Sequence, residues 1–206
     1  MLAVENLHVF RGDRHVLRAL SFELTAGCCL RVTGVNGAGK TTLLRALCGL
    51  VEAEEGVLRW RGVETSRSAP GYHAELAYLG HDAPLKADLS GRENIRYAVG
   101  LRRVLDREAV SRALERVGAT AFAERPVRSL SAGQRRRIAF AALWLCGATL
   151  WLLDEPNTNL DTQGQELVAG LIEEQLRAGG LVVAAVHQEL HLTAGRRMDL
   201  VIPGGR

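Results

Sequence analysis

The sequence predicts an α/β fold whose central sheet contains parallel strands that are buried on both faces. Residues 150–153 and 181–186 are continuous apolar runs of strand length, and such runs are typical of strands that are covered on both sides. Between roughly residues 84 and 146 the strand patterns vanish and apolar residues recur at helical spacing. We therefore expect one domain, residues 1–206, with a helical subdomain inserted at 84–146.

The chain begins with a predicted pair of antiparallel strands. Residues 2–9 and 16–24 alternate apolar with polar positions, and the turn-forming Gly12 and Asp13 separate them. A short apolar strand follows at 28–33 and leads into a glycine-rich loop. We expect the strand pair to form an antiparallel β sub-lobe beside the central sheet.

Helical spacing of apolar residues predicts the next elements. Residues 41–50, directly after the glycine-rich loop, carry leucines at this spacing. Within the inserted segment the same pattern predicts three helices, at 92–104, 106–117 and 132–146.

Composition is that of an ordinary globular protein, with 47% apolar and 24% charged residues. A formal net charge of +3 is too weak to indicate nucleic acid as the main ligand, and the three arginines at 135–137 are predicted to lie on a solvated helix face. The four cysteines lack CxxC metal spacing, which favours buried thiols in a reducing cytosol. The longest apolar run, 138–153, is broken by Gly147, and the N-terminus lacks a signal-peptide pattern, so we expect any membrane role to come through a partner.

Residues 34–42 match the phosphate-binding (Walker A) pattern G-x-x-x-x-G-K-[ST] between a predicted strand and a predicted helix. Glycines allow consecutive backbone N–H groups to surround phosphate oxygens at the positive end of the helix. Lys40 would reach the β and γ phosphates, and the Thr41 hydroxyl would bind Mg²⁺. Phosphate binding by itself leaves kinases, GTPases and transporters open. The predicted nucleotide-binding residues are Gly34, Val35, Asn36, Gly37, Ala38, Gly39, Lys40, Thr41 and Thr42.

A second motif, Leu-Ser-Ala-Gly-Gln at 130–134, narrows this choice. Ser131 is a predicted helix N-cap, and the amides that follow it, near Gly133, can bind a γ-phosphate. The later apolar strand ends in two acids. Asp154 is placed to bind Mg²⁺, and Glu155 to accept a proton from the attacking water.

This order of motifs resembles the ABC ATPase family. The resemblance implies a P-loop NTPase of the ABC ATPase type, with a RecA-like mixed-sheet core, an antiparallel β sub-lobe and an inserted helical subdomain. It also implies an ATPase that uses ATP and Mg²⁺ and works as a homodimer, in which the signature at 130–134 acts on ATP held by the opposite subunit. His187 matches the switch histidine of the family, and residues 159–161 resemble its D-loop at the dimer seam.

Three positions depart from the pattern of the family. The loop glutamine falls at His81, followed by Asp82, and either of these could sense Mg²⁺. The aromatic that stacks on adenine falls at Arg11, beside Phe10, and either the ring or the planar guanidinium could stack on the base. Asn157 stands where the family usually has an aromatic residue, and we have no account of that change.

More closely, the chain resembles the ATP-binding subunits of the cytochrome c maturation system, from residue 17 to about 191. The most specific stretches are residues 72–73, 76–81, 89–94, 130–137, 143–145, 148–151 and 186–188.

This closer resemblance implies a peripheral subunit on the cytoplasmic face of the bacterial inner membrane. Its partners would be the integral subunits CcmB, CcmC and CcmD and, indirectly, the haem chaperone CcmE. ATP hydrolysis would drive haem export or the release of the haem-loaded chaperone. The alternatives are an ATPase subunit of another small ABC transporter and a soluble scaffold ATPase of the iron–sulfur assembly type.

Overall fold

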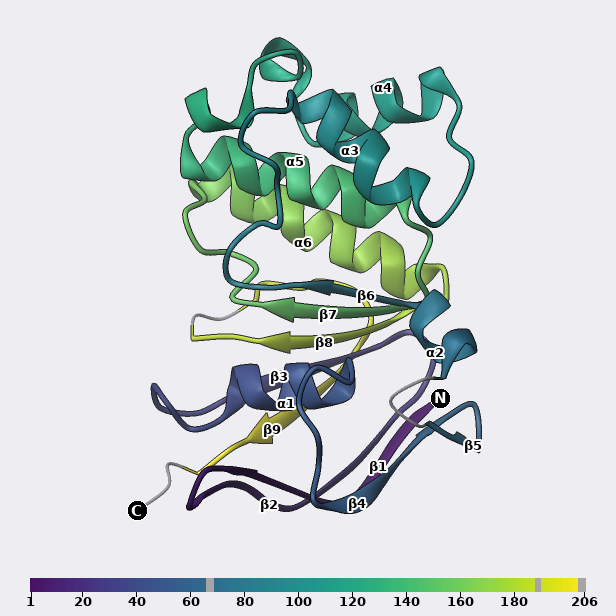
Figure 1. Ribbon diagram of the computed structural model, residues 1–206, viewed down its shortest axis with the longest axis vertical. Coiled ribbons are helices and arrows are strands. Elements are labelled where there is room, and N and C mark those ends of the chain that lie inside the picture. Colours follow the sequence, from purple (N-terminus) through teal and green to yellow (C-terminus); the bar gives the residue numbers. More distant parts are fainter. Residues whose placement is uncertain (66–68, 188–189, 204–206) are drawn as a thin grey trace.

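The computed structural model describes residues 1–65, 69–187 and 190–203. Helix α1 (Lys40–Leu47) lies between the two sheets, and helices α5 (Ala132–Leu145) and α6 (Thr162–Arg177) lie on the far side of the larger sheet (Figure 1). Gln188, one of the residues that carry the closer resemblance, lies outside the described residues. The described part thus forms layers in which the central sheet has helices on both faces, as predicted for its apolar strands.

The helices account for all the predicted helical segments. Segment 41–50 corresponds to α1, and the three predicted helices of the inserted segment correspond to α3, α4 and α5. Between residues 84 and 146, all of which are described, the only β pairing is an isolated bridge between Ser90 and Pro126. The boundaries of the helical subdomain stay a prediction. The helices are α1 (Lys40–Leu47), α2 (Pro70–Ala74), α3 (Gly91–Gly100), α4 (Arg107–Arg116), α5 (Ala132–Leu145) and α6 (Thr162–Arg177), with 3₁₀ turns at Thr120–Phe122 and Val127–Ser129.

The sub-lobe is a four-stranded antiparallel sheet in the order β2-β1-β4-β5. The predicted strand pair and its turn are confirmed in β1 and β2. Strand β4 has no counterpart in the sequence prediction, because Trp60 is the one fully buried residue of the strand and the regular alternation is missing. The strands are β1 (Leu2–Arg11), β2 (Arg14–Leu24), β4 (Glu55–Trp60) and β5 (Val63–Glu64).

The central sheet has five strands in the order β6-β7-β8-β3-β9, and every described pairing in it is parallel. Parallel and antiparallel strands are both present, as expected, but they lie in two separate sheets and do not mix within the central one. The fold class is confirmed, since both sheets and the covering helices are present. The strands are β3 (Cys28–Thr33), β6 (Leu76–Leu79), β7 (Leu150–Asp154), β8 (Leu181–Ala185) and β9 (Arg196–Val201).

Strand β7 shows why the predicted strands lack a polar face. Trp151 and Leu153 pack in a core with residues of α3 to α6, whereas Leu150 and Leu152 pack in a second core with α1 and the antiparallel sheet. Because both faces are covered, both sets of alternating positions must be apolar. Strand β9 lies at the sheet edge and is largely exposed, so its charged sequence gave no apolar pattern.

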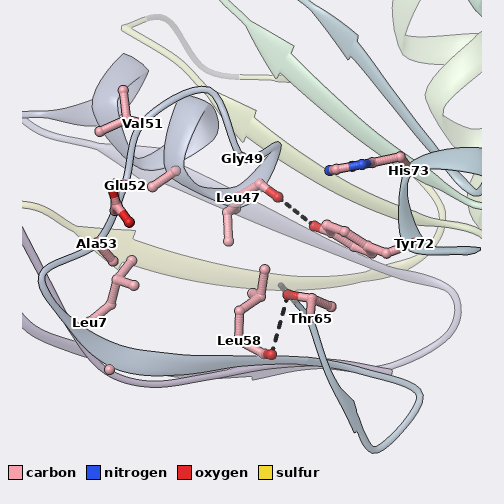
Figure 2. A pocket seen from close by; sticks show the side chains of 12 residues that line it. Leu7, Leu47, Gly49, Val51, Glu52, Ala53, Leu58, Thr65, Tyr72 and His73 are labelled. Carbon is pink, nitrogen blue, oxygen red and sulfur yellow. Dashed lines mark hydrogen bonds between the residues drawn. The ribbon is translucent and has the colours of Figure 1, made fainter. Parts of the chain in front are cut away.

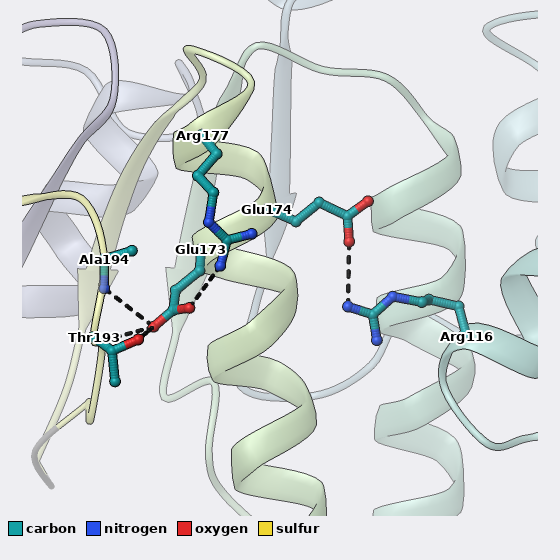
Figure 3. A network of polar contacts seen from close by, with 6 residues as sticks. All are labelled: Arg116, Glu173, Glu174, Arg177, Thr193 and Ala194. Carbon is teal, nitrogen blue, oxygen red and sulfur yellow. Dashed lines mark hydrogen bonds and ion pairs between the residues drawn. The ribbon is translucent and has the colours of Figure 1, made fainter.

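Two neighbouring carboxylates of helix α6 bind the chain segments on either side of the helix (Figure 3). This helix has no counterpart among the predictions from the sequence. Glu173 accepts hydrogen bonds from the backbone N–H and the hydroxyl of Thr193, the latter at 2.8 Å, and pairs with Arg177 at 2.8 Å. Glu174 accepts from Trp144 Nε1 at 3.1 Å and from Arg116 at 3.2 Å. One helix therefore fastens the segment after β8 to helices α4 and α5.

None of the helices formed by the described residues is long and apolar enough to cross a membrane.

We predict that Glu173→Gln destabilises the fold by about 1–3 kcal/mol at neutral pH, because the variant loses charge-assisted hydrogen bonds. The donors of Thr193, the backbone N–H foremost, hold the pKa of Glu173 below its ordinary value. A lowered folded-state pKa stabilises the fold above the ordinary carboxyl pKa, and this contribution disappears as the pH falls through the folded-state value.

Urea unfolding at several pH values measures this effect. The stability gap between parent and Glu173→Gln should narrow as the pH falls below about 4.5, the ordinary pKa of a glutamate. The exposed Glu166 on the same helix supplies the control, Glu166→Gln, which should show no such gap. A gap that does not change with pH would contradict the assigned role of the Glu173 carboxylate.

Candidate functional site

The glycine-rich loop between β3 and α1 has the backbone conformation of an anion cradle. Gly37 and Gly39 have φ angles of 75° and 114°, which residues with a side chain rarely adopt. A Cβ atom at Gly39 would also lie 2.7 Å from Val16 Cγ1. Since α1 begins at Lys40, its unpaired N-terminal amides lie at this loop, where they can bind phosphate oxygens.

Lys40 is almost fully buried above this loop, with 6% of its surface exposed. Its Nζ donates to the carbonyl of Gly34 at 2.8 Å and to that of Val35 at 3.3 Å, and lies 3.2 Å from His187 Nε2. The ammonium group is therefore held at the loop by neutral carbonyls, where an incoming phosphate can pair with its charge.

The end of β7 brings two carboxylates to the same place. Asp154 is 3% exposed, and its Oδ1 accepts a hydrogen bond from Thr41 Oγ1 at 3.2 Å. Glu155 has a φ of 49°, a left-handed conformation that is strained for glutamate, and its N–H donates to the carbonyl of Ala185 at 2.9 Å. The turn at Glu155 thus separates the two side chains, one toward Thr41 and the other toward His187.

His187, directly after β8, lies between two groups of opposite charge. Its Nε2 is 3.0 Å from Glu155 Oε1 and 3.2 Å from Lys40 Nζ. A neutral imidazole nitrogen either donates or accepts, so this nitrogen can bond only one of the two at a time. With hydrogen on Nε2 the ring binds Glu155, and with hydrogen on Nδ1 it accepts from Lys40.

Apart from Asp154, these side chains border a pocket of about 510 Å³ whose other wall is the β1–β2 hairpin. Arg11, Arg14 and Val16 form that wall, and Arg14 also donates to the carbonyl of Gly37 at 3.4 Å. Phe10 instead stacks on His15, with ring centroids 4.0 Å apart, and is absent from the pocket lining. Of the two residues considered for base stacking, Arg11 therefore lies at the pocket. Arg14 and Val16 were missed, because nothing in the sequence marks which hairpin positions face the loop.

The signature segment lies apart from this pocket. Ser131 caps α5 as predicted: its hydroxyl accepts from the N–H of Gln134 at 3.2 Å, and the Gln134 side chain accepts from the N–H of Ser131 at 3.0 Å. Gly133 packs on the loop after β7, since a Cβ atom there would lie 2.8 Å from the carbonyl of Asn159. Neither Ser131 nor Gly133 lines the pocket around Lys40.

His81 lies in the loop after β6, with an exposed side chain outside the pocket lining. Asp82 beside it is also exposed. Asn157 lines a neighbouring pocket of about 300 Å³ that shares Glu155 and His187 with the pocket around Lys40, and among the described residues its buried Oδ1 has no hydrogen-bond partner. The structure thus brings together the predicted residues Lys40, Thr41, Asp154, Glu155 and His187, and leaves Ser131, Gly133 and His81 apart from them.

The prediction that residues 135–137 form a solvated face is wrong. Arg136 is 3% exposed, and Arg135 and Arg137 are partly buried. Arg135 donates to the carbonyl of Leu130 at 2.9 Å and Arg137 to that of Val117 at 3.2 Å. The error arose because a guanidinium can be buried when backbone carbonyls satisfy its donors, and a sequence does not display those carbonyls.

Another pocket lies between the end of α1 and the antiparallel sheet (Figure 2). It is lined by residues such as Leu7, Leu58 and Tyr72, and the Tyr72 hydroxyl donates to the carbonyl of Leu47 at 2.7 Å. None of the predicted site residues lines it. The pocket around Lys40 is therefore the candidate site.

The oxygen atoms at the candidate site fit a magnesium ion. Thr41 Oγ1 and Asp154 Oδ1 are neighbours beside the phosphate loop, and a hydroxyl with a carboxylate is a donor set that Mg²⁺ accepts in combination with phosphate oxygens.

Comparison with known proteins agrees with this geometry. Residues 17–158 match the family model of the ABC transporter. Two curated relatives, both named cytochrome c biogenesis ATP-binding export protein CcmA, come from Nitrosococcus oceani and Methylococcus capsulatus. The first is 44% identical over 97% of this chain and 91% of its own length. The second is 45% identical over 92% of each chain.

Among solved structures, a dimeric ATP-binding cassette in a post-hydrolysis state, bound to ADP and phosphate, has the same fold. Its TM-score is 0.81 and its identity 20%, with 91% of this chain and 88% of that chain covered. The matches to sequence relatives extend over nearly the whole chain, and the residues of the candidate site lie within them. This chain therefore belongs to the ABC transporter ATP-binding family and, within it, to the cytochrome c biogenesis ATP-binding export proteins.

Proposed function

We propose that the chain is the ATP-hydrolysing subunit of a cytochrome c biogenesis export complex and works as half of a homodimer. The observation that carries the proposal is the convergence of Lys40, Thr41 and Glu155 at one pocket beside the phosphate loop, with Asp154 hydrogen-bonded to Thr41. The shared family with the export proteins of Nitrosococcus oceani and Methylococcus capsulatus supports the biological part.

Nucleotide binding is assigned to the loop 34–42. The backbone N–H groups of the loop and of the first turn of α1 bind the phosphates, and Lys40 exchanges its carbonyl partners for β and γ oxygens. Arg11 forms part of the pocket wall on the hairpin side, where its planar guanidinium can stack on a purine.

Thr41 and Asp154 are the residues that would hold Mg²⁺, which when bound neutralises charge on the phosphate oxygens. The role of Asp154 is supported by its burial, since a buried carboxylate needs a charged or hydrogen-bonding partner.

Hydrolysis is assigned to Glu155, which accepts a proton from the attacking water. His187 holds this carboxylate through Nε2 at 3.0 Å in the arrangement described above. When the phosphates draw Lys40 away from His187, the histidine is free to orient Glu155 or to contact the γ-phosphate itself.

The second half of the site is assigned to another copy of the chain. Ser131 and the amide of Gly133 lie at the start of α5, where N-terminal donors can bind a γ-phosphate. Because these residues do not line the Lys40 pocket of their own chain, they would complete the pocket of the partner. The known dimeric cassette with the same fold supports this arrangement.

The membrane partners follow from the biological assignment. They would be CcmB, CcmC and CcmD, with CcmE acting as the released haem chaperone, and the chain would be a peripheral subunit on the cytoplasmic face of the inner membrane. Residues 84–146 would form the helical subdomain, and His81 or Asp82 in the loop before it would report the state of the nucleotide to these partners. An ATPase subunit of another small ABC transporter would share the chemistry and differ in its membrane partner, whereas a soluble scaffold ATPase of the iron–sulfur assembly type would share the chemistry without a membrane partner.

We predict that Glu155→Gln keeps ATP binding but lowers hydrolysis by about 10²–10⁴-fold, because the amide cannot accept a proton. The stalled protein should accumulate as an ATP-bound dimer in size-exclusion chromatography. Glu23→Gln, at an exposed position of β2, is the control and should hydrolyse ATP at the parent rate. Parent-level activity in Glu155→Gln would remove Glu155 from the role of base.

Ser131→Arg should abolish turnover without weakening ATP binding by the loop of its own chain, because the signature acts on the nucleotide of the partner. Mixing this variant with Lys40→Ala gives dimers in which one composite site carries both changes and the other carries neither. Partial activity should therefore return in the mixture. Loss of ATP affinity in the Ser131→Arg monomer would contradict the arrangement in trans.

In cells that carry Glu155→Gln, c-type cytochromes should fail to mature while the haem chaperone still acquires haem. The loaded chaperone should remain bound to the membrane complex, because ATP-driven closing and reopening of the dimer is needed for its release. Haem staining of membrane proteins, combined with a pull-down of this subunit, measures both effects. Normal cytochrome c levels would exclude the maturation role and leave the ATPase assignment intact.

A further inference from the structure

Arg136 on α5 is a buried cation that has no place in the chemistry described so far. Its guanidinium donates to five backbone carbonyls, and each of its five N–H groups has a partner. The carbonyls belong to Gly80 at 2.7 Å, His81 at 3.2 Å, Asp154 at 2.9 Å, Glu155 at 2.9 Å and Pro156 at 3.4 Å.

These carbonyls come from two segments that are far apart in the sequence. Gly80 and His81 lie in the loop after β6, whereas residues 154–156 form the end of β7 and the turn after it. Arg136 itself is fixed to α5, and its guanidinium also lies over the ring of Phe140, 5.6 Å from the centroid. One side chain thus holds a helix, a loop and the strand end that carries both site carboxylates.

The charge on Arg136 persists at neutral pH. Burial lowers the pKa of Arg136 to about 10, and the neighbouring carboxylates of Asp154, Glu155 and Asp82, with the Tyr78 hydroxyl, oppose this effect. The guanidinium therefore keeps its charge and all its N–H donors. Its electrostatic interaction with those carboxylates changes when a cation or a phosphate binds near them.

The position of Arg136 on α5 connects its hydrogen bonds to the signature segment at the start of the same helix. Ser131 caps the same helix five residues earlier, which is about 7.5 Å along the axis. The helix is a continuous unit of 14 residues, so a shift of its second turn moves its N-terminus as well. The backbone of Asp154 and Glu155 is thereby joined to the donors at Ser131 through a single rigid connection.

We propose that Arg136 is a positioning residue that couples the two ATP sites of the dimer. The inference rests on the proposed trans arrangement, in which the signature of each chain meets the nucleotide of its partner. Binding of Mg-ATP in one pocket changes the charges around Asp154 and Glu155. Arg136 transmits this change to α5, and the signature at the start of α5 passes it to the partner's pocket. The same guanidinium transmits it to the backbone at His81, in the loop before the helical subdomain.

The test compares Arg136→Gln and Arg136→Lys with Arg135→Gln, a control that removes a neighbouring arginine of the same helix. A glutamine cannot reach five carbonyls, and lysine carries its donors on one atom. Because Arg136 does not line the Lys40 pocket, ATP affinity per chain should stay within about twofold of the parent. The rate of hydrolysis should fall by about 5- to 150-fold, the range of ordinary coupling energies.

The decisive readout is the dependence of hydrolysis on ATP concentration. The parent and Arg135→Gln should hydrolyse ATP cooperatively, with a Hill coefficient above one, whereas both Arg136 variants should give a coefficient of one. Rates are counted per chain that binds ATP, so that a poorly folded fraction does not enter. A cooperative Arg136→Gln enzyme, or a parent without cooperativity, would overturn the proposal.

Hydrogen exchange keeps the proposal testable if neither Arg136 variant folds. Ser131→Arg binds ATP to its own loop but cannot form the sandwich. Mg-ATP should nevertheless change the exchange of amides 133–137 in this monomer, because Arg136 connects them to residues 154–156. No change there would overturn the coupling. Failure of the proposed function gives a different result: a parent that neither dimerises nor depends on Glu155 for hydrolysis.

Discussion

The parallel pairing of β3, β7 and β8 is the constraint on which the site depends. Parallel strands end at the same edge of a sheet, so the phosphate loop, the Asp154–Glu155 pair and His187 meet there, although more than a hundred residues separate the loop from the other two. The parallel direction also requires long connections, and these supply the helices that cover both faces. Burial of the sheet and assembly of the site are therefore consequences of one arrangement.

Each buried charged side chain near this edge of the sheet is stabilised by its own set of hydrogen-bond partners. Lys40 is satisfied by loop carbonyls, Asp154 by the Thr41 hydroxyl, and Arg136 by five carbonyls of two chain segments. Each partner is neutral, so each charge remains available to respond when phosphates, which carry charge of their own, enter the pocket. The backbone of Glu155 also depends on these contacts, because its strained φ angle persists only if the surrounding structure holds the turn in place.

The phosphate loop and the signature segment occupy different places in the single chain. The pocket around Lys40 has the phosphate cradle and the Glu155 carboxylate, with Asp154 hydrogen-bonded to Thr41, whereas the donors at the start of α5 lie outside its lining. Gly133 packs against the carbonyl of Asn159, so the signature is fixed relative to the loop after β7. This separation gives a physical reason for dimerisation: a second copy can supply the donors that the pocket lacks.

The sequence by itself determined the features that depend on local patterns: the phosphate loop with its glycines, the helix N-cap at Ser131, the doubly buried strands and the acids at the end of β7. It did not reveal β4, β6 or β9, because these strands are short or exposed and owe their conformation to pairing with neighbours. It left Phe10 and Arg11 as equal alternatives, and only the packing of Phe10 on His15 put Arg11 at the pocket. It also misplaced Arg136 on the surface, since the five carbonyls that make its burial possible are brought together only when β6, β7 and α5 pack against one another.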